Sequence, residues 1–179
     1  MLAIAATVLI VGGIALTGVL AASQDQLAVV LRAYAQSRGV PYSWGGGQNG
    51  FVWPQGGPGL RGGIGWDCLG WVKAVIKTFA PDSEAAQVKG TGTDFWRHFG
   101  YPKGGMAGAQ LGDIVWWVND SGDLVHVGFL ISATHAVSAF GGGSSTNGDK
   151  ASAKIQEHGI SRSATGGLTV LGTARWLGR

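Results

Sequence analysis

The chain has 179 residues, of which 45% are hydrophobic and 13% are charged, and its formal net charge is +3. This length suits one domain with a hydrophobic core and is short for two. No run of Lys or Arg forms a basic stripe, so we expect no nucleic-acid partner. The 33 glycines far exceed the usual ~7% and follow no fixed period, which excludes a collagen-like fibre and indicates a loop-rich globular domain.

Residues 1–22 differ from the rest of the chain in hydropathy. There is no charged residue from Leu2 to Ala22, and a helix of this length would cross the ~30 Å hydrocarbon core of a bilayer. We interpret the segment either as a transmembrane anchor or as a secretory signal that is cleaved after its small residues. The missing Lys/Arg-containing start slightly favours the anchor, and the lack of a polar face argues against a buried core helix. Both main interpretations place a single domain, residues 23–179, outside the cytoplasm.

The first part of this domain predicts a helix and then a long loop. Apolar residues recur at helical spacing from Leu27 to Tyr34, and Ser23 or Asp25 is placed to cap the start of the helix. Residues 45–65 are rich in glycine and long for a connection in a compact domain. Loops of this length are more often functional or mobile than idle.

A second helix is predicted from Cys68 to about Phe79, opened by Asp67 and closed before Pro81. A short amphipathic helical segment follows at Thr93–Phe99. Beyond it the hydrophobic period changes to that of β-strands. The predicted strands are Asp113–Val118, Leu124–Ile131, Ala136–Phe140, Leu168–Leu171 and Ala174–Leu177. Helices followed by a meander of strands indicate an α+β fold with an antiparallel sheet.

Cys68 is the only cysteine of the chain, so it can form no intramolecular disulfide. It lies in the first turn of the predicted second helix, where unpaired backbone N–H groups and the helix dipole favour an anion. That placement predicts a lowered thiol pKa and a reactive thiolate. A cysteine nucleophile also needs a proton acceptor and donor, and His126 is the histidine that interrupts an otherwise apolar strand. We therefore expect Cys68 and His126 to be catalytic.

Four segments in order resemble the motifs of NlpC/P60 peptidases, over nearly the whole chain after the N-terminal segment. These are Tyr42-Ser43-Trp44-Gly45-Gly46, Asp67-Cys68-Leu69-Gly70, Leu111-Gly112-Asp113-Ile114-Val115 and His126-Val127-Gly128. The resemblance implies a papain-like α+β fold, with N-terminal helices packed on an antiparallel sheet. It also implies a Cys–His pair, a third polar residue that orients the histidine, and cleavage next to D-glutamate in peptidoglycan stem peptides. No cofactor or metal is implied.

The resemblance also implies roles for residues near the thiol. Tyr42 places its hydroxyl beside the thiol and donates to the oxyanion, although a tyrosine here also suits the core. Asp67 either caps the helix, or faces a free amino group of the substrate, or does both. Trp44 and the glycines after it are expected to serve packing and turn geometry. Asp113 is expected to hold the turn before its strand.

Two departures from the family pattern affect the site. Leu69 stands where the family usually has serine, which removes a polar contact near the substrate. The third polar residue is commonly His, Asn or Gln, but Ser138 stands at its place, and His135 is the alternative if the hairpin is shifted by one residue. His98 and His158 lie in polar, turn-like contexts and are expected at the surface.

Trp53 and Pro54 of the long loop, and Trp66 just after it, are expected to wall a substrate groove. Taken together, the sequence predicts a cysteine endopeptidase of peptidoglycan at a bacterial cell surface, membrane-anchored through residues 1–22 or secreted. The alternatives are an amidase that cuts between sugar and peptide, a thiol acyltransferase, and a catalytically silent wall-binding module.

Overall fold

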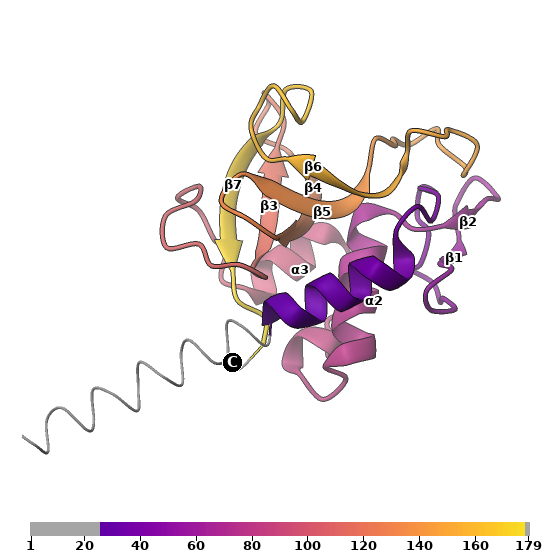
Figure 1. Cartoon of the computed structure of the whole chain (residues 1–179), viewed down its shortest axis with the longest axis horizontal. Helices are drawn as coiled ribbons and strands as arrows, with labels where there is room; N and C mark the ends of the chain where they lie inside the picture. The colour runs from indigo at the N-terminus through magenta and orange to yellow at the C-terminus, as the bar shows by residue number, and fades with distance from the viewer. Residues whose placement is uncertain (1–25, 178–179) are drawn as a thin grey trace, which may run out of the picture.

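A computed structural model describes residues 26–177 of the chain (Figure 1). The first helix spans residues 26–37. The remaining elements follow in this order: β1 Gly57–Pro58, β2 Ile64–Gly65, α2 Cys68–Phe79, the 3-10 helix η1 Glu84–Gln87, α3 Gly92–His98, β3 Ile114–Val118, β4 Leu124–Leu130, β5 His135–Phe140, β6 Lys154–Gly159 and β7 Thr169–Ala174. Helices precede the main strands, so the predicted α+β order is confirmed.

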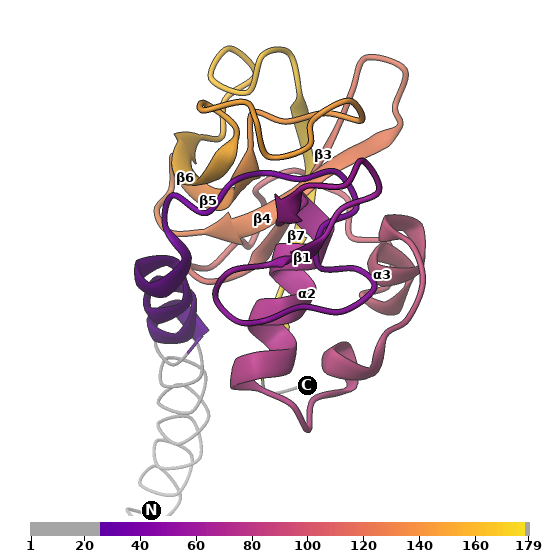
Figure 2. The same cartoon turned by 90° about the vertical axis from the view of Figure 1, so that its right-hand side faces the viewer.

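The five long strands form one antiparallel sheet in the order β6-β5-β4-β3-β7. Neighbours along the chain are mostly neighbours in the sheet, and only β7 crosses over to pair with β3. The first helix and α2 lie on the same side of this sheet, as both views show (Figures 1 and 2). The arrangement has two layers, one of helices and one of strands.

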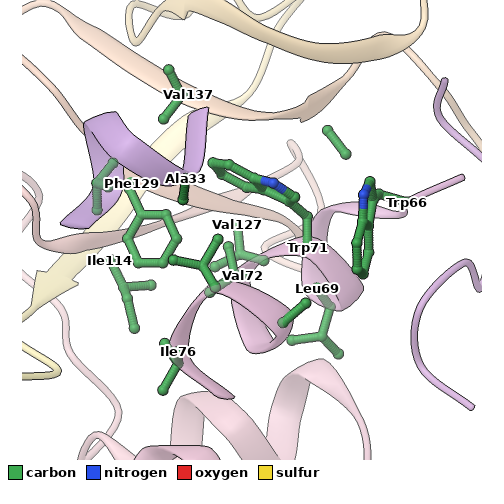
Figure 3. Close-up of a cluster of buried hydrophobic side chains, with 14 of the residues drawn as sticks. Ala33, Trp66, Leu69, Trp71, Val72, Ile76, Ile114, Val127, Phe129 and Val137 are labelled. Carbon is green, nitrogen blue, oxygen red and sulfur yellow. The ribbon is translucent and has the colours of Figure 1, made fainter. Parts of the chain in front are cut away.

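The core lies between α2 and the sheet, and α2 packs against β4 and β5 (Figure 3). Val72 and Ile76 of α2 are fully buried against Val127 and Phe129 of β4. The ring of Trp71 meets that of Phe129 edge-on, with centroids 5.7 Å apart. Each such side chain stabilises the fold by ~1.5–3 kcal/mol when it leaves water. A helix anchored this firmly gives its first turn a fixed position over the sheet.

Alternate residues of β4, β5 and β6 point to the opposite face of the sheet. There a smaller cluster contains Val115, Trp117, Leu130 and Ala136. His126 and Leu130 are four residues apart on β4, so their side chains point to the same face of the sheet. The residue of β3 that pairs with His126 is Trp117. His126 therefore belongs to the face turned away from the core of α2.

Two features of the strand order differ from the prediction. β6 was not predicted, because its residues Lys154–Gly159 contain one aliphatic side chain, Ile155, among polar ones and give no alternating pattern. The first predicted closing strand corresponds to β7, which continues to Ala174, and residues 175–177 of the second are not in a strand. The pairing of β7 with β3 shifts register between Trp116 and Trp117. A register shift such as a β-bulge interrupts the alternation of apolar and polar residues from which strands are predicted.

The predicted anchor or signal, residues 1–22, and the proposed caps Ser23 and Asp25 lie outside the described residues. Within residues 26–177, no helix is both long enough and apolar enough to cross a membrane.

Candidate active site

The start of α2 is fixed by Asp67, which is the N-cap of the helix as predicted. Its Oδ1 accepts a hydrogen bond from the backbone N–H of Gly70 at 2.6 Å. Its Oδ2 accepts from the N–H of Gly45 at 3.1 Å and from the side-chain amide of Gln48. The carboxylate is buried, and it ties the Gly-rich loop to the helix start. The cap role is therefore present in the structure, and most of the carboxylate's accepting capacity is already used.

Cys68 follows as the first residue of α2, and the residue as a whole is partly exposed although protein closely surrounds its sulfur. Its sulfur accepts hydrogen bonds from backbone N–H groups at the helix start, those of Cys68 and Leu69, and from the N–H of Val127 on β4. These donors favour the thiolate, as the helix-start argument predicted. Val127 is the residue after His126, so this contact brings the thiol to the strand that carries the histidine.

The pKa of the Cys68 thiol is nevertheless raised, to about 12. Burial is the largest cause and the negative charge of Asp67 is the second, and together they outweigh the three N–H donors. The predicted lowering of the thiol pKa is therefore wrong for the free protein. Sequence position shows the helix dipole, but it does not show how far the surroundings exclude water.

His126 lies in β4 and is 8% exposed. Its Nε2 is 2.8 Å from the hydroxyl of Ser138 on the neighbouring strand β5. Burial, and then the nearby His158, lower the pKa of His126 to about 3, so the imidazole is neutral at ordinary pH. The rings of Trp117 and Phe140 flank it, with centroids 5.2 and 5.3 Å from its own.

Gly128 makes room for the contact between these strands. A Cβ at this position would lie 2.9 Å from the Cβ of Ser138 and 2.7 Å from the carbonyl oxygen of Val137. Both distances are too short for real carbon contacts, so a larger residue would push β5 away and lengthen the His126–Ser138 hydrogen bond. The close approach of β5 thus explains why glycine occupies the last position of the His126-Val127-Gly128 motif.

Cys68 and His126 line the same cavity of about 150 Å³. Among the described residues, no hydrogen bond joins the sulfur to the imidazole in this structure, since the sulfur is turned to the N–H of Val127. Catalytic hydrogen bonds are often long or unaligned in free enzymes and tighten when substrate binds. Because Nε2 is held by Ser138, Nδ1 is the ring nitrogen left for the thiol.

A second cavity of about 460 Å³ adjoins the first and shares Trp44, Val125 and His126 with it. Trp44 is 38% exposed and lines both cavities. Gln48 lines the first cavity and was missed, because its only signal was its place in a Gly-rich loop. The two cavities therefore meet at His126, and together they are called the groove below.

Trp53 and Trp66 do not line either of these cavities, so the expected aromatic wall of the groove is wrong. Trp66 is fully buried, and its indole N–H donates to the carbonyl of Pro54 at 2.9 Å. Trp53 packs edge-on against Phe79 at the end of α2, with centroids 5.5 Å apart. Large aromatic rings gain most by leaving water, and here they fasten the long loop to α2.

Tyr42 is 4% exposed and lines the larger cavity. Burial raises its pKa, and the nearby Cys68 and Asp67 raise it further, so the phenol stays protonated. Asp113, in turn, accepts from the N–H of Gln110 at 2.9 Å and holds the turn before β3, as expected.

The remaining histidines differ in their surroundings. His135 is exposed, and its Nδ1 is 2.9 Å from the hydroxyl of Thr134. His98 is half-buried against the ring of Phe99. His158 lies in β6 and is half-buried, with Nε2 2.8 Å from the hydroxyl of Ser138. The surface assignment of His158 is therefore wrong, and the error follows from missing β6.

No family model and no curated protein matches the chain. Solved structures match its fold. The peptidoglycan hydrolase RipB of Mycobacterium tuberculosis is 22% identical with a TM-score of 0.53, over 89% of this chain and 68% of its own. The P60 domain of an M. avium paratuberculosis antigen is 20% identical with a TM-score of 0.52, over 87% of this chain and 96% of its own.

A third match, from Staphylococcus aureus, is a protein of the NLP/P60 family similar to a lipoprotein. It is 17% identical with a TM-score of 0.54, over 87% of this chain and 42% of its own. Two of the three are named as P60 proteins. The chain therefore has the NlpC/P60 fold that its four motifs predicted.

Proposed function

We propose that the chain is a cysteine endopeptidase that hydrolyses stem peptides of peptidoglycan, with Cys68 as nucleophile and His126 as general base and acid. The observation that carries the proposal is the meeting of Cys68 and His126 in one cavity, each held by its own hydrogen bonds. A nucleophile, a base, and a third group that orients the base are the parts that such catalysis needs.

The raised thiol pKa and the lowered imidazole pKa define the starting state of the reaction. Thiol and imidazole are both neutral, so the proton moves from Sγ to Nδ1 of His126 as the sulfur attacks the scissile carbonyl carbon. Each charge then stabilises the other, since a thiolate raises the pKa of an adjacent imidazole. The S–C bond forms and the carbonyl oxygen becomes an oxyanion.

The oxyanion lies near donors that stay protonated. Backbone N–H groups at the start of α2 are candidates because they donate to the sulfur. The hydroxyl of Tyr42 is a candidate because the family resemblance implies that it lies beside the thiol. The proton on Nδ1 of His126 then passes to the leaving amine as the C–N bond breaks. Water, deprotonated by His126, attacks the thioester, and the proton returns to the sulfur as the S–C bond breaks.

The substrate class rests on the resemblance and on the groove. Two cavities that meet at His126 suit an extended peptide passing across the site. RipB, which shares the fold, is a peptidoglycan hydrolase. Cleavage next to D-glutamate follows from the family pattern, with Asp67 as the candidate partner for a free amino group of the substrate. Leu69 is buried at the cavity and removes the polar contact that serine would give there.

We further propose that the domain works outside the cytoplasm, bound to the membrane through residues 1–22 or released after their cleavage. The uncharged apolar run supports this proposal. A chain that begins at Ser23 should remain in the supernatant after ultracentrifugation, while the full chain sediments with membranes. Sedimentation of the shortened chain, or its need for detergent to fold, would contradict the proposal.

Fragment masses from purified peptidoglycan identify the reaction. An endopeptidase releases fragments cut within the stem peptide. An amidase instead frees whole stem peptides from the sugar chain, and a silent wall-binding module co-sediments with peptidoglycan and releases nothing. We expect cuts within the stem, and either of the other patterns would overturn the assignment.

A further inference from the structure

His158 and His126 are joined through the hydroxyl of Ser138. Nε2 of His126 is 2.8 Å from Oγ of Ser138, and the same Oγ is 2.8 Å from Nε2 of His158. Nδ1 of His158 is 3.1 Å from the carbonyl oxygen of Gly159. All three separations are ordinary hydrogen-bond lengths. The three side chains come from β4, β5 and β6, and they share the sheet face turned away from α2.

These hydrogen bonds form a chain from His126 through Ser138 and His158 to Gly159. The carbonyl oxygen of Gly159 can only accept, so it determines which atom donates in every bond of the chain. Nδ1 of neutral His158 must carry the proton, which leaves a lone pair on Nε2. The hydroxyl of Ser138 donates its single proton to that lone pair and accepts from Nε2–H of His126. The network therefore assigns a lone pair to Nδ1 of His126, the nitrogen left for the Cys68 thiol.

We propose that His158 is a positioning residue that, acting through Ser138, fixes His126 in the tautomer able to accept the thiol proton. This inference rests on the proposed roles of Cys68 and His126. Serine alone orients an imidazole weakly, since its hydroxyl can rotate and can either donate or accept. Donation to His158 removes that freedom and makes the oxygen a stronger acceptor. Ser138 and His158 together then do what one His, Asn or Gln does in the family pattern.

The position of His158 is itself well defined. Its ring stacks on that of Phe140, with centroids 4.0 Å apart and planes at 17°. Trp117 of β3 lies on another side, with ring centroids 5.7 Å apart. In the pairing of β5 with β6, Ser138 is opposite Gln156 and Ala136 is opposite His158. His158 is two residues from Gln156 and therefore lies diagonally across from Ser138 on the same face of the sheet. Packing and register hold the imidazole where the serine can donate to it.

Protonation of His158 would exchange donor and acceptor in the hydrogen bonds that join it to Ser138 and His126. Its Nε2 would then donate to Ser138, the serine would donate to Nε2 of His126, and the proton of His126 would move to Nδ1. Burial lowers the pKa of His158 and keeps this state rare. The charged and titratable groups around His158 are His126 of β4, His135 of β5 and Glu157 of β6, while β3 presents the uncharged Trp117.

The test compares two substitutions of His158 in the full chain in detergent. His158→Phe keeps an aromatic ring to stack on Phe140 but loses the acceptor for Ser138. His158→Gln keeps an acceptor, its side-chain oxygen. His135→Phe is the matched control, because it removes an exposed histidine of the adjacent strand that has no hydrogen bond to Ser138. Retained far-UV and near-UV circular dichroism shows that each variant is folded.

The first readout is the tautomer of His126, from two-dimensional NMR of chain labelled with ¹⁵N-histidine. We expect the wild type, His158→Gln and His135→Phe to carry the proton on Nε2 of His126, and His158→Phe to show a mixture of tautomers. An unchanged tautomer in His158→Phe would overturn the inference, and so would a wild type protonated on Nδ1. This readout needs no hydrolysis, so it stands or fails separately from the proposed activity.

The second readout is peptidoglycan hydrolysis. His158→Phe should lower kcat roughly 10-fold with little change in KM. This pattern is typical of a residue that orients a reacting side chain without contacting the substrate. His158→Gln should recover most of that loss. In the Ser138→Ala background His158→Phe should cost nothing more, because the link is already broken. Additive losses, or equal losses in the Phe and Gln variants, would show a packing role and overturn the inference.

Discussion

Oγ of Ser138 lies 2.8 Å from Nε2 of His126, although the two residues are 12 positions apart on neighbouring strands. Serine is the shortest side chain that can make this contact, and it does so because Gly128 leaves the space between the strands open. The hydrogen bond determines which nitrogen of His126 is available to Cys68.

Ser138→Ala should lower the turnover of peptidoglycan roughly 10-fold with little change in KM, because the imidazole loses its orienting partner while the groove stays intact. His135→Ala is the matched control on the same strand, and it should be nearly silent because His135 is exposed and bonded to Thr134. Steady-state hydrolysis of soluble stem peptides checks both. A damaging His135→Ala beside a harmless Ser138→Ala would assign the role to the other residue.

Alkylation of Cys68 by iodoacetamide should be slow at neutral pH and should still be rising above pH 9. The reason is the raised thiol pKa, about 12, since only the thiolate reacts. The measurement is unambiguous because the chain has one cysteine. A rate that is already at its plateau below pH 7 would instead show a preformed thiolate paired with an imidazolium.

The free energy of unfolding should fall as the pH drops below 6.5, in part because of His126. Its pKa is near 6.5 when unfolded and about 3 when folded, so between these values the unfolded chain binds a proton that the folded chain does not. The stability from the neutral, buried imidazole is complete above pH 6.5 and is lost as the pH falls toward 3. The raised pKa of Asp67 acts in the opposite sense in acid.

Urea unfolding at pH 7, 6 and 5 isolates the histidine contribution when variants are compared. His126→Asn should reduce the slope of stability against pH by up to about 1.4 kcal/mol per pH unit. His135→Asn, an exposed control, should keep the wild-type slope. Equal slopes in the wild type and His126→Asn would mean that the imidazole of His126 is not buried in its neutral form.

Much of the fold could be predicted from the sequence, because the strongest signals are local. The cap at Asp67 and the apolar face of α2 identified the second helix to the residue. The apolar runs of β3 and β4 marked the centre of the sheet. β6 escaped because it lies at the edge of the sheet, where few of its side chains need to be apolar.

The site was predicted where it depends on local sequence and missed where it depends on the approach of distant segments. Cys68 and His126 stood out from their own neighbours. The place of His158 depends on the pairing of β5 with β6, and the thiol pKa depends on how much protein surrounds the sulfur. Neither quantity can be obtained from spacing along the chain.

Fragment release by active-site variants shows directly whether Cys68 attacks a peptide bond of the cell wall. Purified peptidoglycan is incubated with the wild type, Cys68→Ala and His126→Ala, and the released fragments are identified by mass. We expect stem-peptide fragments from the wild type, none above background from Cys68→Ala, and a loss nearly as large in His126→Ala, with circular dichroism unchanged. If a folded Cys68→Ala variant released fragments at the wild-type rate, Cys68 would not be the nucleophile.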